Sequence, residues 1–208
     1  MRLIGVNIGQ ARPIANWNGT TGIDKHPQPG PVRIETDGVV GDAICDRKHH
    51  GGPDQAVYCY LQSDYDWWRL ELGRDLPPGS FGENLTIDGI DGTTLAVGDR
   101  IGIGNVLLEV TSHRTPCNTF ARHMGDKTFA KRFHQAGRPG AYLRVLAEGE
   151  VAAGMEVTYT PFGGERFTVA EYMSLDGQRD VPEDTMRRLL ATPVHYKTRA
   201  EYERRLAS

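Results

Sequence analysis

The 208-residue sequence has no apolar run approaching the roughly 18 residues that a membrane-spanning helix needs, and no long run of like charge. Its formal net charge is −3, so bulk charge gives no indication of a surface for a nucleic-acid polymer. The first stretch, MRLIGVNIGQARPI, lacks the apolar core and the small-residue cleavage site of a signal peptide. We therefore expect a cytoplasmic protein that acts neither on a membrane nor on a nucleic-acid polymer.

Cysteine is also scarce. Three cysteines, Cys45, Cys59 and Cys117, are too few for a disulfide framework, and the odd number fits free thiols in a reducing compartment. Hydrophobic residues make up 38% and charged residues 25% of the chain. This balance predicts a packed core and excludes a disordered chain, and the length indicates one or two domains.

Glycine, by contrast, is abundant, with 25 residues spread along the chain. Short segments rich in β-branched residues lie between turn signals, which predicts a mainly β fold of the barrel or sandwich type. In AVYCYLQ, Val57, Cys59 and Leu61 share one strand face and Tyr58 and Tyr60 share the other. Cys59 is therefore predicted to be a small core residue. The candidate strands are RLIGVNI, VRIE, VVGDAI, AVYCYLQ, NLTI, RIGIGNVLLEVTSH, AYLRVLAEG and MEVTYT.

Helical patterns interrupt the strands and then replace them. The segments SDYDWWRLELG and DKTFAKRFHQAG predict helices that end at Gly73 and Gly137. From about residue 165, FTVAEYMSLDG, PEDTMRRLLAT and TRAEYERRLAS predict three short helices. We place a boundary at Gly163–Gly164, between a β-rich domain (1–163) and a small helical unit (164–208).

Two loop segments are rich in polar groups. GDAICDRKHHGGPDQAV (41–57) fits a solvated loop, an anion-binding loop or a metal site. Its His and Cys residues are good zinc ligands, but their spacing matches no zinc motif. In PPGSFGENLTIDG (77–89), Asn84 fits either a ligand contact or a turn.

The third candidate is Cys117, in SHRTPCNTFARHMG (112–125). Arg114 and the start of a predicted helix both favour the thiolate form of this cysteine. A buried, inert thiol is the alternative, but the polar neighbours make a poor apolar pocket and favour a functional thiolate. Arg138, in AGRPGAY, is placed like a phosphate clamp at the start of a predicted hairpin, or else lies in a surface turn.

Taken in order, five segments resemble the MOSC family, which is named for the C-terminal domain of molybdenum cofactor sulfurase. The helical tail resembles the three-helix extension of the bacterial YiiM-like branch, so the likeness covers nearly the whole chain. It implies a closed β-barrel of the pyruvate-kinase extra-domain type with a few helices, followed by a helical subdomain. The matching segments are TGIDKHPQPGPV, GVVGDAICDRKHHGGPDQAVYCY, FGENLTIDG, VGDRIGIGNVLLEVTSHRTPCNTF and GRPGAYLRVLAEGEVAAGMEV.

The resemblance also implies a chemistry. It implies a molybdenum–molybdopterin cofactor with Cys117 as the metal ligand and catalytic residue, which agrees with the affinity of a soft thiolate for such a centre. The implied reaction is reduction of N-hydroxylated compounds, such as hydroxylaminopurine-type bases, with electrons from a separate, flavin-type reductase. The candidate cofactor-binding residues are Lys25, His50, Arg114 and Arg138 for the anionic parts, Gly51 for close approach, and Phe81 and Asn84 at the pterin.

Two other functions stay open at this point. The chain would act as a carrier if Cys117 held the cofactor, or its sulfur as a persulfide, and passed it on. It would act as a zinc hydrolase if Cys45, His49 and His50 held the metal. No flavin or haem motif is present in the sequence, so a reductase of this kind needs an electron-donating partner.

Overall fold

The computed structural model describes residues 1–14, 19–46 and 51–208. An eight-stranded mixed sheet forms its centre, and the strand order along it is β13-β9-β10-β11-β7-β8-β1-β4. Only β7 and β8 pair in parallel; the other neighbours are antiparallel. The bounds are β1 Arg2–Gly9, β4 Lys25–Pro27, β7 Val57–Leu61, β8 Leu85–Asp88, β9 Arg100–Ile103, β10 Val106–Ser112, β11 Ala141–Ala147 and β13 Val157–Thr160.

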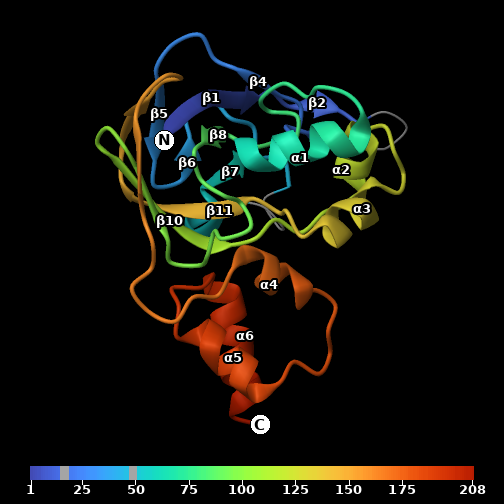
Figure 1. Ribbon diagram of the computed structural model, residues 1–208, viewed down its shortest axis with the longest axis vertical. Coiled ribbons are helices and arrows are strands. Elements are labelled where there is room, and N and C mark those ends of the chain that lie inside the picture. The colour runs from blue at the N-terminus through green and yellow to red at the C-terminus, as the bar shows by residue number, and fades with distance from the viewer. Residues whose placement is uncertain (15–18, 47–50) are drawn as a thin grey trace.

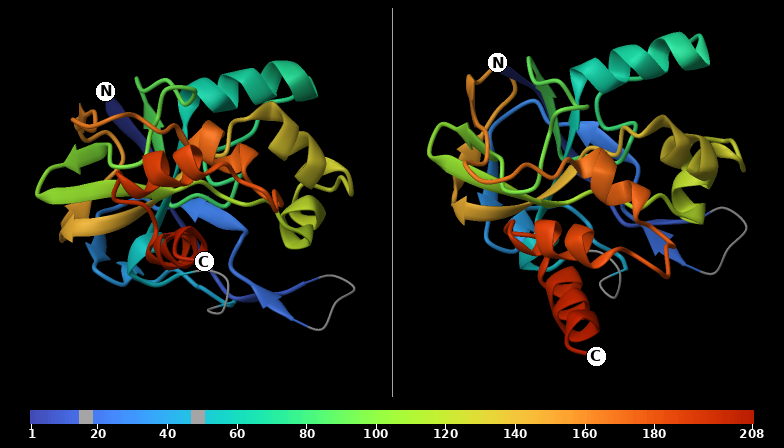
Figure 2. Two further views of the ribbon diagram at one scale, coloured as in Figure 1. Left: turned by 90° about the horizontal axis from the view of Figure 1, so that it is seen from below. Right: turned by 60° about the horizontal axis from the view of Figure 1, so that its bottom comes forward.

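Two smaller sheets accompany the large one. One has the order β12-β5-β6 and the other is the β2-β3 pair, which projects away from the main sheet in both views of Figure 2. Their bounds are β5 Val32–Glu35, β6 Gly38–Val39, β12 Gly149–Val151, β2 Arg12–Pro13 and β3 Thr20–Thr21.

The predicted closed barrel is wrong, because the large sheet is open among the described residues. The first residues of the chain nevertheless contact the segment that leads into β13: Leu3 N–H donates to Met155 O (2.9 Å), Gly154 N–H to Leu3 O (2.7 Å) and Val157 N–H to Met1 O (3.1 Å), and a bridge joins Arg2 to Glu156. Beyond that point β1 pairs with β4, and β13 pairs with β9. Strand periodicity predicts which segments are extended, but it does not predict which edges pair.

The alternating side chains of β7 contribute to two separate cores, one on each face of the strand. All five of its residues are buried. Cys59 and its same-face neighbours Val57 and Leu61 lie in an aliphatic core, whereas Tyr58 and Tyr60 lie in an aromatic cluster on the other face. The predicted alternation of this strand, and the core position of Cys59, are confirmed.

Helices cover the aromatic face of β7. Figure 1 shows α1 (Gln62–Leu72), α2 (Asn118–His123) and α3 (Phe129–Ala136) on one side of the sheet. α1 ends at Gly73 and α3 at Gly137, both in the left-handed conformation (φ 64° and 66°), as predicted. Glycine adopts this conformation without the steric penalty of a Cβ atom.

The three predicted C-terminal helices are present as α4 (Val169–Ser174), α5 (Glu183–Leu190) and α6 (Tyr196–Leu206). They lie below the sheet in Figure 1 and have their own apolar cluster, which also includes Val97 of the β-rich part. Hydrogen bonds cross the predicted boundary, among them Val97 N–H to Phe167 O (3.0 Å) and Val169 N–H to Leu95 O (2.9 Å). The division at 163/164 stays a prediction.

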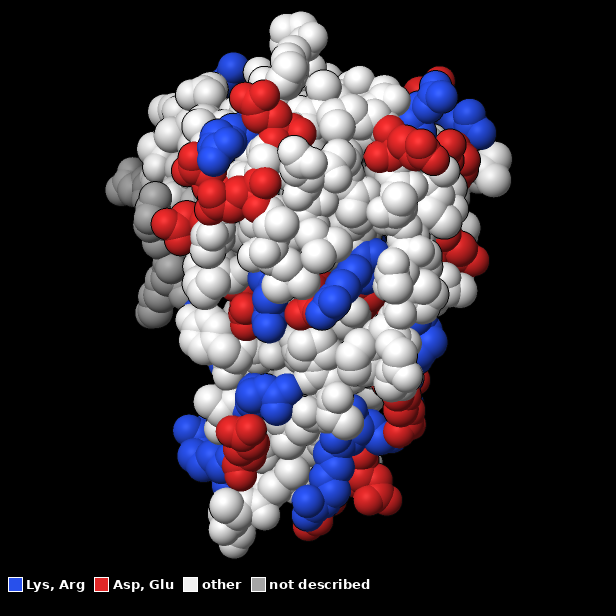
Figure 3. Space-filling model, turned by 90° about the vertical axis from the view of Figure 1, so that its left-hand side faces the viewer, with Lys and Arg blue, Asp and Glu red and all other residues white. Residues whose placement is uncertain are grey.

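The face drawn in Figure 3 shows no large area of charge of one sign. On the side drawn in Figure 3, basic and acidic side chains lie next to each other over both the sheet and the C-terminal helices. Among the helices of the described residues, none combines the length and the apolar composition that crossing a membrane requires.

A buried acid, Asp99, anchors the start of the helical tail. Its side chain is fully buried and contacts both guanidinium Nη atoms of Arg166 (2.7 and 2.8 Å). It also accepts hydrogen bonds from Phe162 N–H (2.8 Å), Ala96 N–H (2.8 Å) and the Tyr159 hydroxyl (2.5 Å). Removing it deprives Ala96 N–H, Phe162 N–H and the Tyr159 hydroxyl of this acceptor. Arg166 keeps its bonds to Thr94 O (2.7 Å) and the Tyr159 hydroxyl (3.2 Å).

We therefore expect Asp99→Ala to lower the free energy of unfolding by about 3 kcal/mol, because the substitution removes the acceptor of several hydrogen bonds, each worth roughly 1–3 kcal/mol where a donor is left unsatisfied. Urea unfolding followed by circular dichroism measures this change. The matched control is Glu183→Ala, which removes an exposed acid from the exposed pair with Arg187 and should leave stability nearly unchanged. Equal effects of the two substitutions would contradict the anchoring role of Asp99.

Candidate functional site

A cavity of about 420 Å³ lies between the β2-β3 pair, the loop that leads into β7, and the segment between β10 and α2. This size is typical of a small-molecule or cofactor site. Residues from five segments line it, together with Ile14 and Tyr142: 19–25, 42–46, 51–58, 82–84 and 114–119.

The structure brings five of the predicted site residues to this cavity from positions far apart in the sequence: Lys25, Gly51, Asn84, Arg114 and Cys117. Two others, Phe81 and Arg138, do not line it. His50, like its neighbour His49, lies outside the described residues.

Arg114 is the main cationic group of the cavity. It is only 5% exposed, and an arginine stays charged even when buried. Its Nη1 donates to the carbonyl of Phe81 (2.8 Å), and its guanidinium carbon lies 5.0 Å from the Tyr58 ring centroid and 4.5 Å from that of Phe120. Its Nε has no hydrogen-bond partner among the described residues. Arg114 also lines the cavity, and a largely desolvated cation in a cavity wall is suited to binding an anion.

Gly82 makes the position of Arg114 possible. Its φ is +72°, and a Cβ atom there would come within 2.8 Å of Ile23 and 3.3 Å of Arg114 Nη1. Any other residue would therefore be strained and would displace the guanidinium.

Lys25 and Asn84 form a polar network around Asp42. Lys25 Nζ donates to both carboxylate oxygens of Asp42, and both side chains are largely buried. Asp42 also accepts hydrogen bonds from Gly9 N–H (2.8 Å) and Asn84 Nδ2 (3.0 Å). Burial lowers the pKa of Lys25, and Asp42 opposes that shift. The lysine charge is thus largely balanced within the protein.

Both the oxygen and the nitrogen of the Asn84 side-chain amide are hydrogen-bonded within the protein. Its Oδ1 accepts from Tyr58 N–H (3.2 Å), and its Nδ2 donates to Asn7 O (3.3 Å) as well as to Asp42. The side chain thus fixes β7, β1 and the Lys25–Asp42 pair relative to one another. The sequence did not single out Asp42 as a site residue, because its only signal was a place among other polar residues of 41–57.

The three cysteines differ sharply. Cys117 is half-buried, is the N-cap residue of α2, and packs against the aromatic cluster. Cys59 is fully buried, and burial raises the pKa of its thiol to about 12. Cys45 is exposed and lines the same cavity as Cys117, which the sequence did not predict. The described residues contain no group of three or more His, Cys, Asp or Glu side chains arranged to hold a metal ion.

Phe81 is a core residue that acts through its backbone. Its ring is fully buried and stacks on Tyr60 at 4.3 Å between centroids, while its carbonyl holds Arg114. The loop conformation depends on Glu83, a fully buried acid that accepts from Gly79 N–H (2.7 Å), Phe81 N–H (3.1 Å) and the Tyr65 hydroxyl (2.6 Å). Burial raises the pKa of Glu83. A role of the Phe81 side chain at a pterin stays a prediction.

Arg138 lies in a different environment. Its Nη1 bonds Asp64 Oδ1 (2.6 Å), and its guanidinium lies 5.2 Å from the Trp67 ring centroid. Asp64 is fully buried and its Oδ2 has no hydrogen-bond partner in the described part of the chain. A cofactor contact of Arg138 stays a prediction, and no described contact brings this side chain to the cavity.

The Asp64 carboxyl makes stability depend on pH. Burial raises its pKa from 3.8 to about 6, although Arg138 acts in the opposite direction. The folded state therefore holds the proton more tightly than the unfolded state, so this group lowers the free energy of unfolding as the pH rises from 4 to 6. We expect a contribution on the order of 3 kcal/mol across this window.

Asp64→Asn removes the titrating group and should remove that part of the pH dependence. Urea unfolding at intervals between pH 4 and 7 measures the difference between the native protein and the variant. If the two free-energy curves run parallel, the carboxyl does not titrate in this range.

Comparison with known proteins places these features in a family. A family model described as the MOSC domain matches residues 46–158, which is more than half of the chain and includes Arg114 and Cys117. The chain is 32% identical over 170 residues to YflK of Bacillus subtilis, covering 80% of this chain and 76% of that protein. The crystal structure of YiiM from Geobacillus stearothermophilus superimposes with a TM-score of 0.80 at 26% identity, covering 99% of this chain and 98% of that one.

A third relative is longer. A protein of Gibberella moniliformis named "Reductase" is 34% identical over 143 residues, which are 65% of this chain but only 25% of that protein. The likeness therefore concerns about a quarter of that reductase.

Proposed function

The chain is a YiiM-like member of the MOSC domain family, and we propose that it is a molybdenum-cofactor-dependent reductase of N-hydroxylated compounds. The observation that carries the proposal is the pairing of two groups in one cavity. Arg114 brings a largely buried guanidinium group to the cavity lining, and Cys117 brings a thiol. The relative named "Reductase" supports a redox activity in the family.

The residues of the cavity fit such a cofactor. Its pterin part carries a phosphate, and the guanidinium of Arg114 is a charge-assisted donor group for an anionic oxygen. The metal centre of the cofactor is rich in sulfur ligands, which are soft, and the thiolate of Cys117 is a soft ligand of the same kind. Arg114 and Cys117 lie three residues apart and line the same cavity, so a single bound molecule would contact both.

The rest of the cavity would position and enclose the ligand. The side chains of Tyr58 and Tyr142 give it an aromatic wall. The Lys25–Asp42–Asn84 network fixes a polar wall with little net charge. Gly51, at φ +83°, lets the backbone of the loop approach a ligand more closely than a side chain would allow.

The reaction sets requirements that the chain does not meet alone. Reducing an N-hydroxylamine to an amine breaks the N–O bond and releases the oxygen as water, which consumes two electrons and two protons. When bound, the cofactor would supply the two-electron redox centre. The electrons come from a separate reductase, which we propose to be of the flavin type.

The first test concerns Cys117. We expect Cys117→Ser to lose reduction of an N-hydroxylated substrate with a supplied artificial electron donor, because a serine oxygen is a harder ligand than a thiolate. The matched controls are Cys45→Ser and Cys59→Ser, which should keep most of the activity. Retained activity in Cys117→Ser would remove the proposed ligand. Cofactor bound without any turnover in the native protein would favour a carrier instead.

The second test concerns Arg114. Losing a charge-assisted hydrogen bond weakens binding by roughly ten- to a hundredfold, so Arg114→Met should lower the pterin content of the purified protein. Arg114→Lys keeps the charge but removes the planar donor, and it should restore only part of that content. Arg74→Met deletes an exposed arginine outside the cavity lining and should leave the content unchanged. Equal pterin content in all three variants would exclude Arg114 from the site.

A further inference from the structure

The helical tail contacts both walls of the cavity. One wall is the segment after β10 that carries Arg114 and Cys117, and the other is the loop of residues 51–56 that leads into β7. Each wall is held by an acid that joins it to the tail: Asp176 for the first wall and Asp54 for the second.

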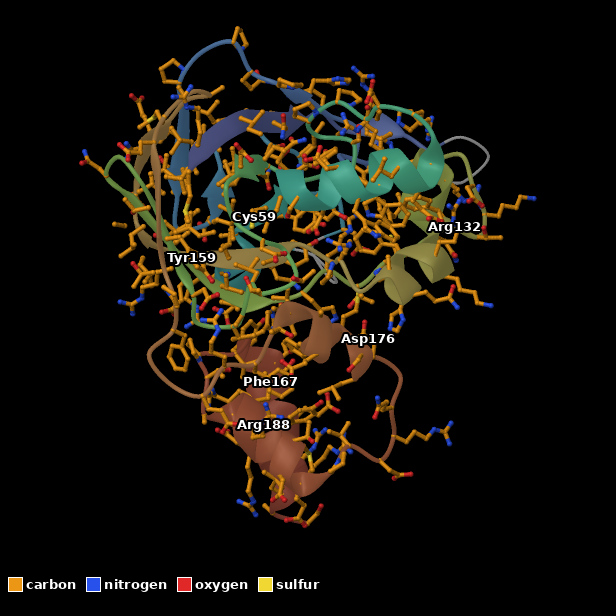
Figure 4. The ribbon with its side chains drawn as sticks, viewed as in Figure 1. Cys59, Arg132, Tyr159, Phe167, Asp176 and Arg188 are labelled. Carbon is orange, nitrogen blue, oxygen red and sulfur yellow. The ribbon has the colours of Figure 1, made fainter. Side chains whose placement is uncertain are left out.

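Asp176 follows α4 and is hydrogen-bonded to both chain neighbours of Arg114, which are His113 and Thr115. Its carboxylate oxygens each lie 3.1 Å from His113 Nε2, and Oδ2 accepts from Thr115 Oγ1 at 3.1 Å. The His113 ring also packs edge-on against Tyr172 of α4, at 4.6 Å between centroids. Figure 4 shows Asp176 at the end of α4, where the tail meets the part above it. Burial opposes ionisation of Asp176, but the bonds from His113 and Thr115 lower its pKa, so it accepts as a carboxylate.

Asp54 fixes the other wall. It lies in the short 3-10 helix η1 (Pro53–Gln55), between cavity residues Gly51 and Gln55. Its Oδ2 accepts from Tyr196 N–H at the start of α6 (2.7 Å), and its Oδ1 lies 3.1 Å from Arg144 Nε. A carboxylate at a helix N-terminus is favourable because it meets free N–H groups and the positive end of the helix dipole.

The contacts of Asp176 and Asp54 with the tail are linked to each other through α4 and α6. The hydroxyls of Tyr172 in α4 and Thr198 in α6 are hydrogen-bonded. Arg144, which pairs with Asp54, also donates to Pro193 O just before α6 (2.9 Å). His195 N–H donates to Thr111 O of β10 (3.0 Å), which adds a tie between the base of α6 and the strand that precedes Arg114.

We propose that the C-terminal helices are a positioning element of the site, with Asp176 holding the Arg114–Cys117 segment and α6 holding the facing loop through Asp54. The inference rests on the proposed function only for the identity of the ligand. The spacing of the buried guanidinium and the thiol depends on the tail, whichever anion occupies the cavity.

The test reads the surroundings of Cys117 in the full-length chain without any cofactor. In a Cys45→Ser background, with Cys59 buried, reaction rates report Cys117. The anionic disulfide 5,5′-dithiobis(2-nitrobenzoate) is compared with the neutral 4,4′-dithiodipyridine, because a nearby guanidinium attracts only the anionic reagent. Its effect on the thiolate fraction speeds both reactions alike and cancels in the ratio of their rates. The ratio of the two rates therefore reports how close the Arg114 guanidinium lies to the Cys117 thiol.

Asp176→Ala should lower this ratio by about three- to tenfold, as expected for loss of hydrogen bonds that hold the segment. Asp176→Asn keeps an acceptor for His113 and Thr115 and should restore most of the ratio. Asp180→Ala removes an exposed acid of the same region and should change nothing. Thr115→Val, which removes one of the contacts to Asp176, should lower the ratio less and provides a second variant if Asp176→Ala does not fold.

An unchanged ratio in folded Asp176→Ala and Thr115→Val would overturn the positioning role, even if the protein reduces N-hydroxylated compounds. A lowered ratio with rescue by Asp176→Asn would support the role, even if no molybdenum is ever bound. The test of the positioning role can therefore fail without the reductase function failing, and the reverse is also true.

Discussion

The structure depends on the burial of one guanidinium. Removing the charge of Arg114 from water is costly unless the protein provides partners. It provides the Phe81 carbonyl, the faces of Tyr58 and Phe120, and the space left by Gly82. The guanidinium also lines the cavity. Its positive charge is the feature on which the proposed anion site depends.

Much of the surrounding structure keeps these partners in place. Glu83 fixes the loop that presents the Phe81 carbonyl, and Asn84 ties that loop to β7, from which Tyr58 projects. On the far side, Asp176 holds both chain neighbours of Arg114. Acidic side chains therefore hold the segments around the site by accepting hydrogen bonds, and Arg114 and Cys117 both lie in the cavity lining.

Local features of the fold were predictable from the sequence, and long-range pairings were not. The alternation in β7, the core position of Cys59 and the glycine ends of α1 and α3 follow from short-range rules. The sheet is open because β1 pairs with β4 at one edge. The periodicity of the sequence does not predict which strands pair. Cys117 and Arg114 were identified because they are close in sequence. Asp42, Asp54 and Asp176 were missed because their partners lie 17 to 142 residues away, and Arg138 proved to be paired with a buried acid on α1.

The metal content of the full-length protein tests the central claim most directly. The protein would be purified from cells that make the molybdenum cofactor and analysed by inductively coupled plasma mass spectrometry. The account predicts near-stoichiometric molybdenum accompanied by pterin, because Cys117 and Arg114 together offer a soft ligand and an anion site. Near-stoichiometric zinc without molybdenum would contradict the account and return the polar loop near Cys45 to consideration as a metal site.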